Sequence, residues 1–272
     1  TYLDPILQRH GHAATSLLQI LREAQEHFGY IHADAITCLT EKLKLPRVKI
    51  EGVATFYSFL YLQPRGEYRV LISDNITDHM LGSAELMKHM CQQLWVEPGK
   101  VSEDNLVSVD STSCTGMCDQ GPAALVNGWP LTNLDNNRLD LISELIRIKK
   151  PVAEWPEMLF EVRDNIRRPG MLLGDEFEPG AGIRAMLARG AEATLKEVDA
   201  SNLRGRGGAG FKTASKWTFC HAAIAEEEGG MICDVGGNPE RFIVCNADEG
   251  EPGTFKDRVL LNSHADLVFE GM

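Results

Sequence analysis

The strongest local signal in the sequence is Ala124-Leu125-Val126-Asn127-Gly128-Trp129-Pro130-Leu131, in which Asn-Gly separates two short apolar runs. The tightest hairpin turns need positive φ angles at both central residues, and Asn followed by Gly tolerates such angles best. The stretch therefore predicts two short strands, residues 124–126 and 129–131, joined by a two-residue turn.

The elements around this hairpin alternate between strand and helix. Short β-prone runs predict strands over residues 68–72 and 106–109. Between them, apolar residues at helical spacing predict a helix capped by Ser83, and residues 139–148 repeat the helical pattern. The order strand, helix, strand, hairpin, helix predicts a small α/β sandwich with a thioredoxin-like layout over residues 63–150.

The residues before this sandwich have helical periodicity. Apolar side chains of residues 17–28 recur every three or four positions, and Gly29 follows where a C-terminal cap belongs. Further helices are predicted over residues 34–44 and directly after Pro46. We therefore predict an N-terminal helical bundle over residues 1–62.

The second half of the chain begins after a predicted linker, residues 151–179, which is rich in proline, glycine and mixed charge. Residues 180–272 then predict an amphipathic helix, a glycine-rich loop, a helix over about 213–227 and a strand over 241–245. One helix pair and one strand cannot close a sheet, so we expect the chain to be a piece of a longer protein. The predicted fold class is α/β.

Composition excludes several classes of function. The chain has 27 basic and 39 acidic residues, a net charge of −12, which argues against nucleic acid because phosphate binding needs clustered Lys and Arg. No apolar run approaches the ~18 residues of a membrane span. The 7 scattered cysteines do not resemble a secreted disulfide framework. We expect a cytoplasmic protein without a membrane span.

A glycine-rich loop is the first candidate for a ligand site. Gly205-Arg206-Gly207-Gly208-Ala209-Gly210 matches G-x-G-x-x-G, but polar residues precede it, so it is not an ordinary Rossmann loop. Glycines let the backbone approach a phosphate or a flat ring, and the following helix offers free amides to an anion. Basic residues surround the loop in an acidic chain. A tight turn between two helices is the alternative.

An acidic segment is the second candidate. Asp248, Glu249 and Glu251 follow the predicted strand closely, although carboxylates at such spacing repel one another. Strand carboxyl ends are where α/β sheets usually bind ligands. A solvated loop is the alternative.

Together, Leu203–Phe211, Ser215-Lys216-Trp217 and Cys245–Arg258 resemble the family of flavoprotein subunits found in complex I, NAD-dependent formate dehydrogenases and NAD-reducing hydrogenases. The resemblance implies FMN and NAD as cofactors and an FMN-binding, Rossmann-like α/β domain that starts within residues 180–272. It implies catalytic roles at the reacting flavin and nicotinamide for Glu249 and Glu251. The implied FMN-binding residues are Gly205, Arg206, Gly207, Gly208, Lys216, Asn246, Asp248 and Glu249. The implied NAD-binding residues are Phe211, Phe219 and Glu251.

The first half, through Glu51–Ser58 and Gly121-Pro122-Ala123, resembles the thioredoxin-like partner subunit of the same complexes. In that family a [2Fe–2S] cluster is held by one C-x₄-C pair and one C-x₃-C pair. Cys114 and Cys118 supply the second pair.

The first pair of positions falls on Ser73 and Asp78. Oxygen ligands weaken a site built for sulfur, so we expect the [2Fe–2S] cluster to be lost. A cluster with these two substituted ligands is the alternative. A [4Fe–4S] cluster is expected beyond Met272. The other cysteines are expected to be structural.

The fusion of the two modules is most similar to the diaphorase alpha subunits of soluble NAD-reducing nickel–iron hydrogenases. Hydride transfer between NAD(H) and FMN is then expected, with electrons passing to an iron–sulfur partner subunit and hydrogenase subunits of a hetero-oligomer. Diaphorases of formate dehydrogenase, of an NADP-reducing hydrogenase or of a complex I-like enzyme are the alternatives, as is a first domain that only docks. A thioredoxin-type oxidoreductase is disfavoured because no C-x-x-C is present.

Overall fold

The computed structural model describes residues 2–168, 170–174, 178–226 and 243–272. Two compact units are formed: unit 1 contains Thr1–Arg163 and Glu249–Phe255, and unit 2 contains Asp164–Asp248 and Lys256–Met272. Each unit is described by itself. Cys233 and the first two residues of the strand predicted over 241–245 lie outside the described residues.

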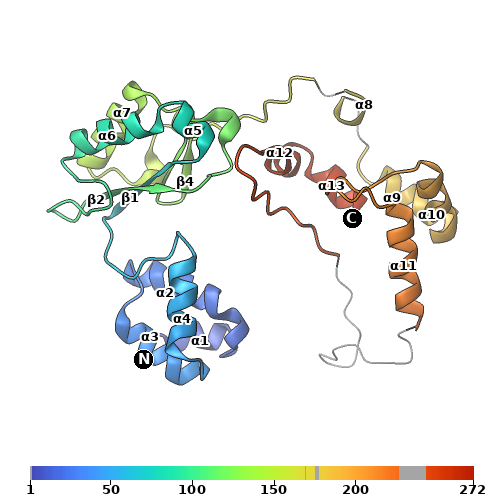
Figure 1. Cartoon of the computed structure of the whole chain (residues 1–272), viewed down its shortest axis with the longest axis horizontal. Helices are drawn as coiled ribbons and strands as arrows, with labels where there is room; N and C mark the ends of the chain where they lie inside the picture. Colours follow the sequence, from blue (N-terminus) through green and yellow to red (C-terminus); the bar gives the residue numbers. More distant parts are fainter. Residues whose placement is uncertain (1, 169, 175–177, 227–242) are drawn as a thin grey trace. The chain divides into compact units, whose positions relative to one another are not determined.

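Unit 1 begins with the predicted helical bundle (Figure 1). Its helices are α1 (Asp4–Arg9), α2 (Leu17–Phe28), α3 (Ala33–Leu43) and α4 (Arg47–Phe56), with a short 3₁₀ turn η1 (Ala14–Ser16). Gly29 ends α2 with a φ of 79°, the left-handed conformation that glycine adopts without steric cost. The fully buried Leu7, Leu21, Leu39 and Ile50 come from four different helices, so one apolar core holds the bundle together.

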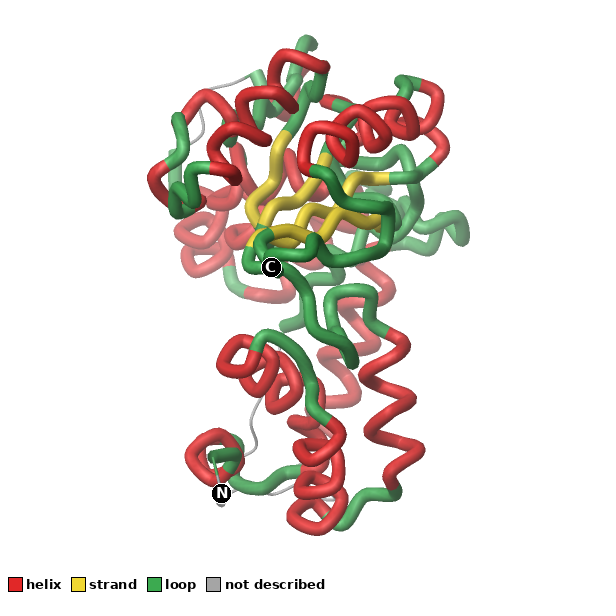
Figure 2. The backbone as a smooth tube through the Cα atoms, turned by 90° about the vertical axis from the view of Figure 1, so that its left-hand side faces the viewer, coloured by secondary structure: helices red, strands yellow, loops and turns green. Residues whose placement is uncertain are grey.

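The second part of unit 1 is a four-stranded sheet of order β2-β1-β3-β4 (Figure 2). Its strands are β1 (Tyr68–Ser73), β2 (Val107–Thr112), β3 (Ala124–Val126) and β4 (Trp129–Leu131). β1 pairs in parallel with β2 and antiparallel with β3, and β3 pairs antiparallel with β4. Asn127 and Gly128 have φ angles of 50° and 86°, which confirms the predicted hairpin turn.

The helices α5 (Ile76–Met80), α6 (Ser83–Leu94) and α7 (Asn136–Arg147) complete the mixed α/β sandwich. α6 and α7 pack against each other and contribute the fully buried Met90 and Ile142 to the core of the sheet. The prediction that Ser83 caps α6 is wrong. Gly82 is the N-cap residue, with a φ of 91°, and the Ser83 hydroxyl is buried without a hydrogen bond in the described structure.

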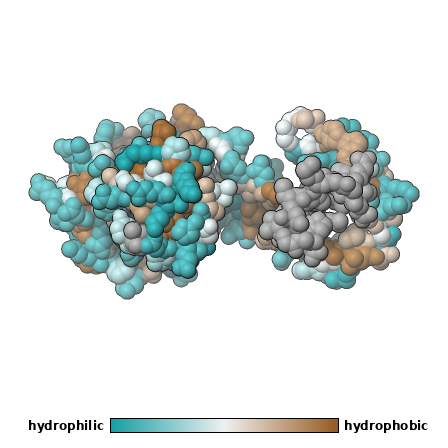
Figure 3. All heavy atoms as spheres, turned by 90° about the horizontal axis from the view of Figure 1, so that it is seen from below, coloured by the Kyte–Doolittle hydropathy of each residue, from teal (hydrophilic) through white to brown (hydrophobic). Residues whose placement is uncertain are grey.

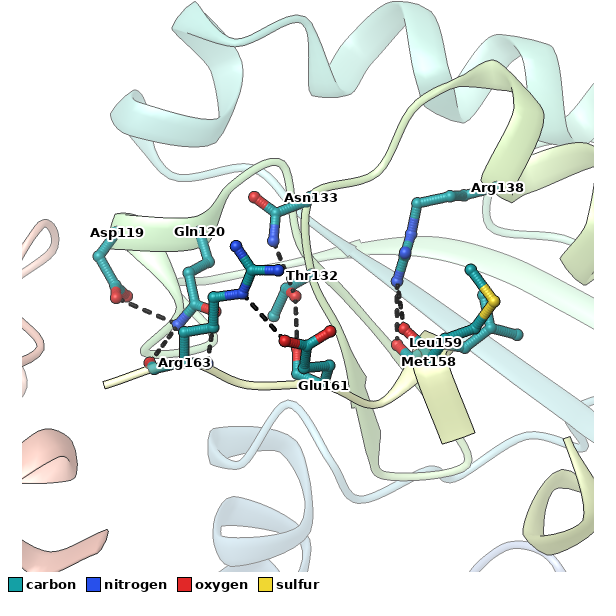
Figure 4. Close-up of polar contacts among 9 residues, drawn as sticks. All are labelled: Asp119, Gln120, Thr132, Asn133, Arg138, Met158, Leu159, Glu161 and Arg163. Carbon is teal, nitrogen blue, oxygen red and sulfur yellow. Dashed lines mark hydrogen bonds and ion pairs between the residues drawn. The ribbon is translucent and has the colours of Figure 1, made fainter. Parts of the chain in front are cut away.

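The first part of the expected linker, residues 151–179, packs on this sandwich through two 3₁₀ turns, η3 (Val152–Glu154) and η4 (Glu157–Leu159). Figure 4 shows the polar contacts that tie it down. The side-chain amide of Gln120 donates to the carbonyl of Arg163 at 2.9 Å and accepts from its backbone amide at 2.8 Å. Arg138 donates to the carbonyl of Leu159 at 3.1 Å. This segment therefore extends the sandwich as far as Arg163.

Unit 2 consists of helices and loops in its described part. Its helices are α8 (Gly170–Leu173), α9 (Ala181–Arg189), α10 (Ala191–Ala200), α11 (Thr213–Glu226), α12 (Lys256–Ser263) and α13 (Ala265–Gly271). The amphipathic helix predicted from residue 180 is two helices, because Gly190 has a φ of 85° and breaks it. Ile243–Cys245, the described part of the predicted strand, forms no strand, since no described segment of unit 2 is a strand with which it could pair.

Unit 2 also leaves apolar side chains on its surface, some of which appear brown in Figure 3. The predicted apolar stripe of α9 is largely uncovered, with Ile183 45% and Leu187 71% exposed. By contrast, the face of unit 1 in Figure 3 is mostly hydrophilic, as its buried cores require. Among the described helices, none is long and apolar enough to cross a membrane.

The buried side chains of α7 belong to the core of the sandwich in unit 1. Ile142 is 0% exposed, so Ile142→Ala should lower the free energy of unfolding by about 2–5 kcal/mol through lost burial and a cavity. Chemical denaturation monitored by circular dichroism measures this. Ile148 ends the same helix and is 63% exposed, so Ile148→Ala is the matched control and should change stability by less than about 1 kcal/mol. Equal losses in the two variants would contradict the assigned core.

Candidate functional site

Ser73 and Asp78, which stand at the first pair of expected cluster-ligand positions, lie inside the sandwich of unit 1. Ser73 ends β1 and Asp78 lies in α5, and both side chains are completely buried. Asn75 links them, because its side-chain amide donates to the Ser73 hydroxyl at 2.8 Å and to the Asp78 carboxylate. The Asn75 carbonyl oxygen caps α5 by accepting from the amides of Thr77, at 2.8 Å, and Asp78.

The Asp78 carboxylate is also tied to the chain that leads into β3. Its Oδ1 accepts a hydrogen bond from the backbone amide of Ala123 at 3.1 Å. Gly121 passes so close to this oxygen that a Cβ atom there would collide with it. Both oxygen side chains are therefore engaged inside the fold.

The thiol pair lies at the start of a 3₁₀ turn, η2 (Cys118–Gln120). The Sγ atoms of Cys114 and Cys118 are 3.2 Å apart, so the C-x₃-C spacing brings the two sulfurs close together. The backbone amide of Gly253 donates to Cys118 Sγ at 3.3 Å within unit 1. Burial raises the pKa of the Cys118 thiol to about 11, and the neighbouring Cys114 sulfur and Asp78 carboxylate add to the rise. Cys118 is therefore a protonated thiol at neutral pH.

The glycine loop of unit 2 is a tight connection into α11. Its ends pair in an antiparallel bridge between Arg204 and Lys212, and the Gly205 amide donates to the carbonyl of Phe211 at 2.9 Å. Gly208 has a φ of 97°, which a side chain would strain. A Cβ atom at Gly207 or Gly208 would meet open space. Because these glycines have no side chains, the backbone of the loop is accessible to a ligand.

The loop carries features of an anion site. Within the part of the chain that the structure describes, the backbone amides of Arg206, Gly207 and Gly208 donate no hydrogen bond. Lys216 stands exposed in the first turn of α11, whose N-terminus carries a partial positive charge. Free amides and a cation at one helix start can hold a phosphate group.

Two aromatic rings border this loop. The ring centroids of Phe211 and Phe219 are 6.5 Å apart with an interplanar angle of 43°, and the side chains are 54% and 65% exposed. Exposed rings at this separation offer an apolar surface to a flat ligand.

The acidic segment is divided between the two units. Asn246 and Asp248 belong to unit 2, where the Asn246 side chain accepts from the Asp248 amide at 3.2 Å. Glu249 and Glu251 belong to unit 1. Glu249 has a φ of 45°, and the Thr254 hydroxyl donates to the Glu251 carbonyl at 2.7 Å, so the segment turns sharply. The predicted flavin and nicotinamide residues are therefore not gathered in one compact unit.

Sequence reasoning missed Asn75 and Gly253. Asn75 had a readable signal, because Asn directly before a helix start, with a carboxylate three residues later, is typical of an N-cap. Gly253 had none, because its contact with Cys118 joins residues 135 positions apart.

Comparison with known proteins places the first half of the chain in a family. Residues 3–147, more than half of the chain, match the model of the thioredoxin-like [2Fe–2S] ferredoxin family. The chain belongs to this family. In addition, residues 198–272 match the Nuo51 FMN-binding domain, which includes the glycine loop and the acidic segment.

Relatives of this ferredoxin-family chain fall into two groups. One is similar over nearly the whole chain: the NAD-reducing hydrogenase HoxS subunit alpha of Cupriavidus necator is 30% identical over 99% of this chain and 45% of its own length. A solved NAD⁺-reducing [NiFe]-hydrogenase in the air-oxidized state is 39% identical, with a TM-score of 0.78, over 94% of this chain and 43% of its own. The chain thus spans about half the length of these relatives.

Relatives in the second group are similar over a smaller share of the chain. An NADH-quinone oxidoreductase subunit of Aquifex aeolicus is 30% identical over 41% of this chain and 70% of its own length. Another NADH-quinone oxidoreductase subunit, from Rhizobium meliloti, is 41% identical over 40% of this chain and 24% of its own length.

The residues of the ferredoxin-family domain do not fit a [2Fe–2S] cluster. Such a cluster takes four thiolates in this kind of site, and only Cys114 and Cys118 are present at the family's positions. Ser73 and Asp78 are held by Asn75 and by the Ala123 amide instead of facing a ligand. Among the described residues, no group of three or more His, Cys, Asp or Glu side chains is arranged to hold a metal ion.

Restoring the thiolates should restore cluster binding. The double variant Ser73→Cys with Asp78→Cys recreates the C-x₄-C pair, so reconstitution with iron and sulfide should add a stoichiometric [2Fe–2S] cluster. Visible absorption, electron paramagnetic resonance and iron and sulfide content, compared with the unchanged full-length protein, measure the gain. The control, Ser73→Ala with Asp78→Ala, removes both oxygens without adding thiols and should gain nothing. A stoichiometric [2Fe–2S] signal already present in the unchanged domain would contradict the misfit.

Proposed function

We propose that the chain is the NAD(H)- and FMN-binding diaphorase part of an NAD-reducing hydrogenase. The observation that carries the proposal is the similarity over 99% of the chain to a hydrogenase alpha subunit. The two NADH-quinone oxidoreductase subunits described above are similar to 41% and 40% of the chain. The order of the ferredoxin-family domain and the FMN-binding domain in one chain therefore favours the hydrogenase type over complex I.

The glycine loop would hold FMN. Its free amides at Arg206, Gly207 and Gly208 suit the phosphate, Lys216 adds a positive charge, and Gly205 allows close backbone approach. When bound, FMN supplies the exchange of a hydride with NAD(H) and of single electrons with iron–sulfur clusters.

The aromatic and acidic residues would position the two cofactors. Phe211 and Phe219 present exposed rings on which the adenine of NAD can pack. The Asn246 amide and the Asp248 and Glu249 carboxylates accept hydrogen bonds from flavin hydroxyl or N–H groups. Glu251 would lie at the nicotinamide and keep misplaced anions away by its charge. Glu249 and Glu251 are thus the proposed catalytic residues.

The surroundings of the protein follow from this function. An iron–sulfur electron-transfer subunit and the hydrogenase subunits would be its partners in a cytoplasmic hetero-oligomer, with a [4Fe–4S] cluster beyond Met272. The acidic net charge of −12 disfavours nucleic acid as a partner.

A second candidate keeps the flavin chemistry but changes the role of the first domain. In a formate dehydrogenase or a complex I-like enzyme, that domain would be a docking scaffold without an iron centre. The engagement of Ser73 and Asp78 inside the fold supports this scaffold role.

Removing the charge of Glu251 should separate hydride transfer from flavin binding. Glu251→Gln in the full-length protein should lower kcat/KM for NADH with an artificial acceptor by about tenfold, or about 1.4 kcal/mol of transition-state stabilisation. FMN content should not change, because the glycine loop and Lys216 hold the flavin. Steady-state kinetics and the flavin absorbance of the same samples measure both quantities.

Glu192 provides the matched control, since it is an exposed glutamate at the start of α10, outside the acidic segment. Glu192→Gln should leave both quantities unchanged. Parallel loss of flavin and activity in Glu251→Gln would refute the assigned role.

A further inference from the structure

The Cys114 and Cys118 thiols of the ferredoxin-family domain lie close enough together for a reaction between them. Their sulfur atoms are 3.2 Å apart, about 1.2 Å more than the length of a disulfide bond. The two cysteines are separated by a three-residue loop in which Gly116 has a φ of 75°, a conformation that lets so short a loop turn back on itself. Little movement separates the two thiols from a covalent bond.

Within the described part of the chain, neither the buried oxygen side chains nor a group of metal ligands is placed to react with the two thiols. Ser73 and Asp78 are satisfied by Asn75 and by the amide of Ala123, so neither oxygen competes for a metal or for a thiol proton. No third ligand for a metal ion stands beside the pair among the described residues. We propose that Cys114 and Cys118 form a reversible disulfide by exchange with a low-molecular-weight disulfide.

The two cysteines differ in access, which sets the order of events. Cys114 is half-buried, whereas Cys118 is 8% exposed and covered by the Gly253 backbone. The Cys114 sulfur, as thiolate, attacks one sulfur of the small disulfide, forms a mixed disulfide and releases one small thiolate. The Cys118 sulfur then attacks Cys114 and gives up its thiol proton, the mixed disulfide bond breaks, and the second small molecule leaves as a thiol with that proton. The protein has lost two protons and two electrons, and the small disulfide has gained them.

The disulfide would reach beyond the loop itself. Cys118 Sγ accepts the hydrogen bond from Gly253, and a disulfide sulfur is a weaker acceptor than a thiol or thiolate. Two residues further, Gln120 binds both backbone groups of Arg163. Oxidation would therefore weaken the hydrogen bond by which the segment Glu249–Phe255 contacts the sandwich.

The sequence allows a direct test. Cleavage after Lys100 and Arg138 by trypsin gives a peptide, Val101–Arg138, that contains Cys114 and Cys118 and no other cysteine. The full-length protein is reduced, equilibrated without oxygen in glutathione buffers of increasing oxidised fraction, quenched with a maleimide and analysed by mass spectrometry. As the oxidised fraction rises, we expect the doubly alkylated peptide to be replaced by a peptide without alkyl groups. The mass of this peptide should be lower than that of the unalkylated reduced peptide by two hydrogen atoms.

Single variants test the order of attack. In Cys118→Ser, Cys114 should stop as a mixed disulfide with glutathione, whereas in Cys114→Ser the buried Cys118 should remain alkylated after denaturing quench. Cys91, which is 6% exposed in α6, serves as the control thiol within each sample and should stay reduced.

Three results would overturn the proposal. The first is a peptide that stays doubly alkylated at every ratio, and the second is a glutathione adduct on Cys114 that persists in the unchanged protein. The third is protection of both cysteines together with stoichiometric iron and sulfide on this domain, which would mean a cluster. The wild-type measurement decides by itself if a variant fails to fold.

Discussion

The buried side chain of Asn75 is the interaction on which the ferredoxin-family domain depends at its candidate site. One amide group caps α5, holds the Ser73 hydroxyl at the end of β1 and binds the Asp78 carboxylate. Asp78 in turn binds the amide of Ala123, next to β3. A buried polar group without a partner lowers the stability of the fold by about 1–3 kcal/mol. Because each of these polar groups has a partner, the network favours a single arrangement of the surrounding strands. The oxygens that stand at ligand positions are consequently structural parts of the sandwich.

Unit 2 obeys a different constraint. Its described helices carry apolar faces, such as that of α9, without a sheet to cover them, and Ile243 and Val244 are 69% and 84% exposed. These apolar side chains are therefore not covered by the described part of unit 2. The glycine loop, in contrast, is closed by its own bridge between Arg204 and Lys212. The geometry of the glycine loop is therefore set locally, whereas the acidic segment is divided between the two units.

Most secondary structure of unit 1 could be predicted, because hairpin chemistry at Asn127-Gly128 and helical spacing in residues 17–28 are local signals. The cap of α6 at Gly82 and the break between α9 and α10 at Gly190 were not predicted, since positive φ angles decide where these helices begin and end and leave no hydrophobic period. The packing of Trp155 and Leu159 within the expected linker was equally invisible, because single buried anchors carry no repeat. Motifs named the candidate site residues, but their division between two units depends on long-range contacts that no motif encodes.

Fusion of the two modules explains how a ferredoxin-type domain can persist without its thiolate set. The NADH-quinone oxidoreductase subunits of Aquifex aeolicus and Rhizobium meliloti match 41% and 40% of this chain, whereas here a ferredoxin-family domain and an FMN-binding module lie in one chain. A covalent link holds two modules together at an effective concentration in about the millimolar range. The described domain is held together by its packing and by polar contacts such as those of Asn75 with Ser73 and of Gln120 with Arg163. The two remaining cysteines at the ligand positions, Cys114 and Cys118, can then form the proposed disulfide, which requires no further ligand.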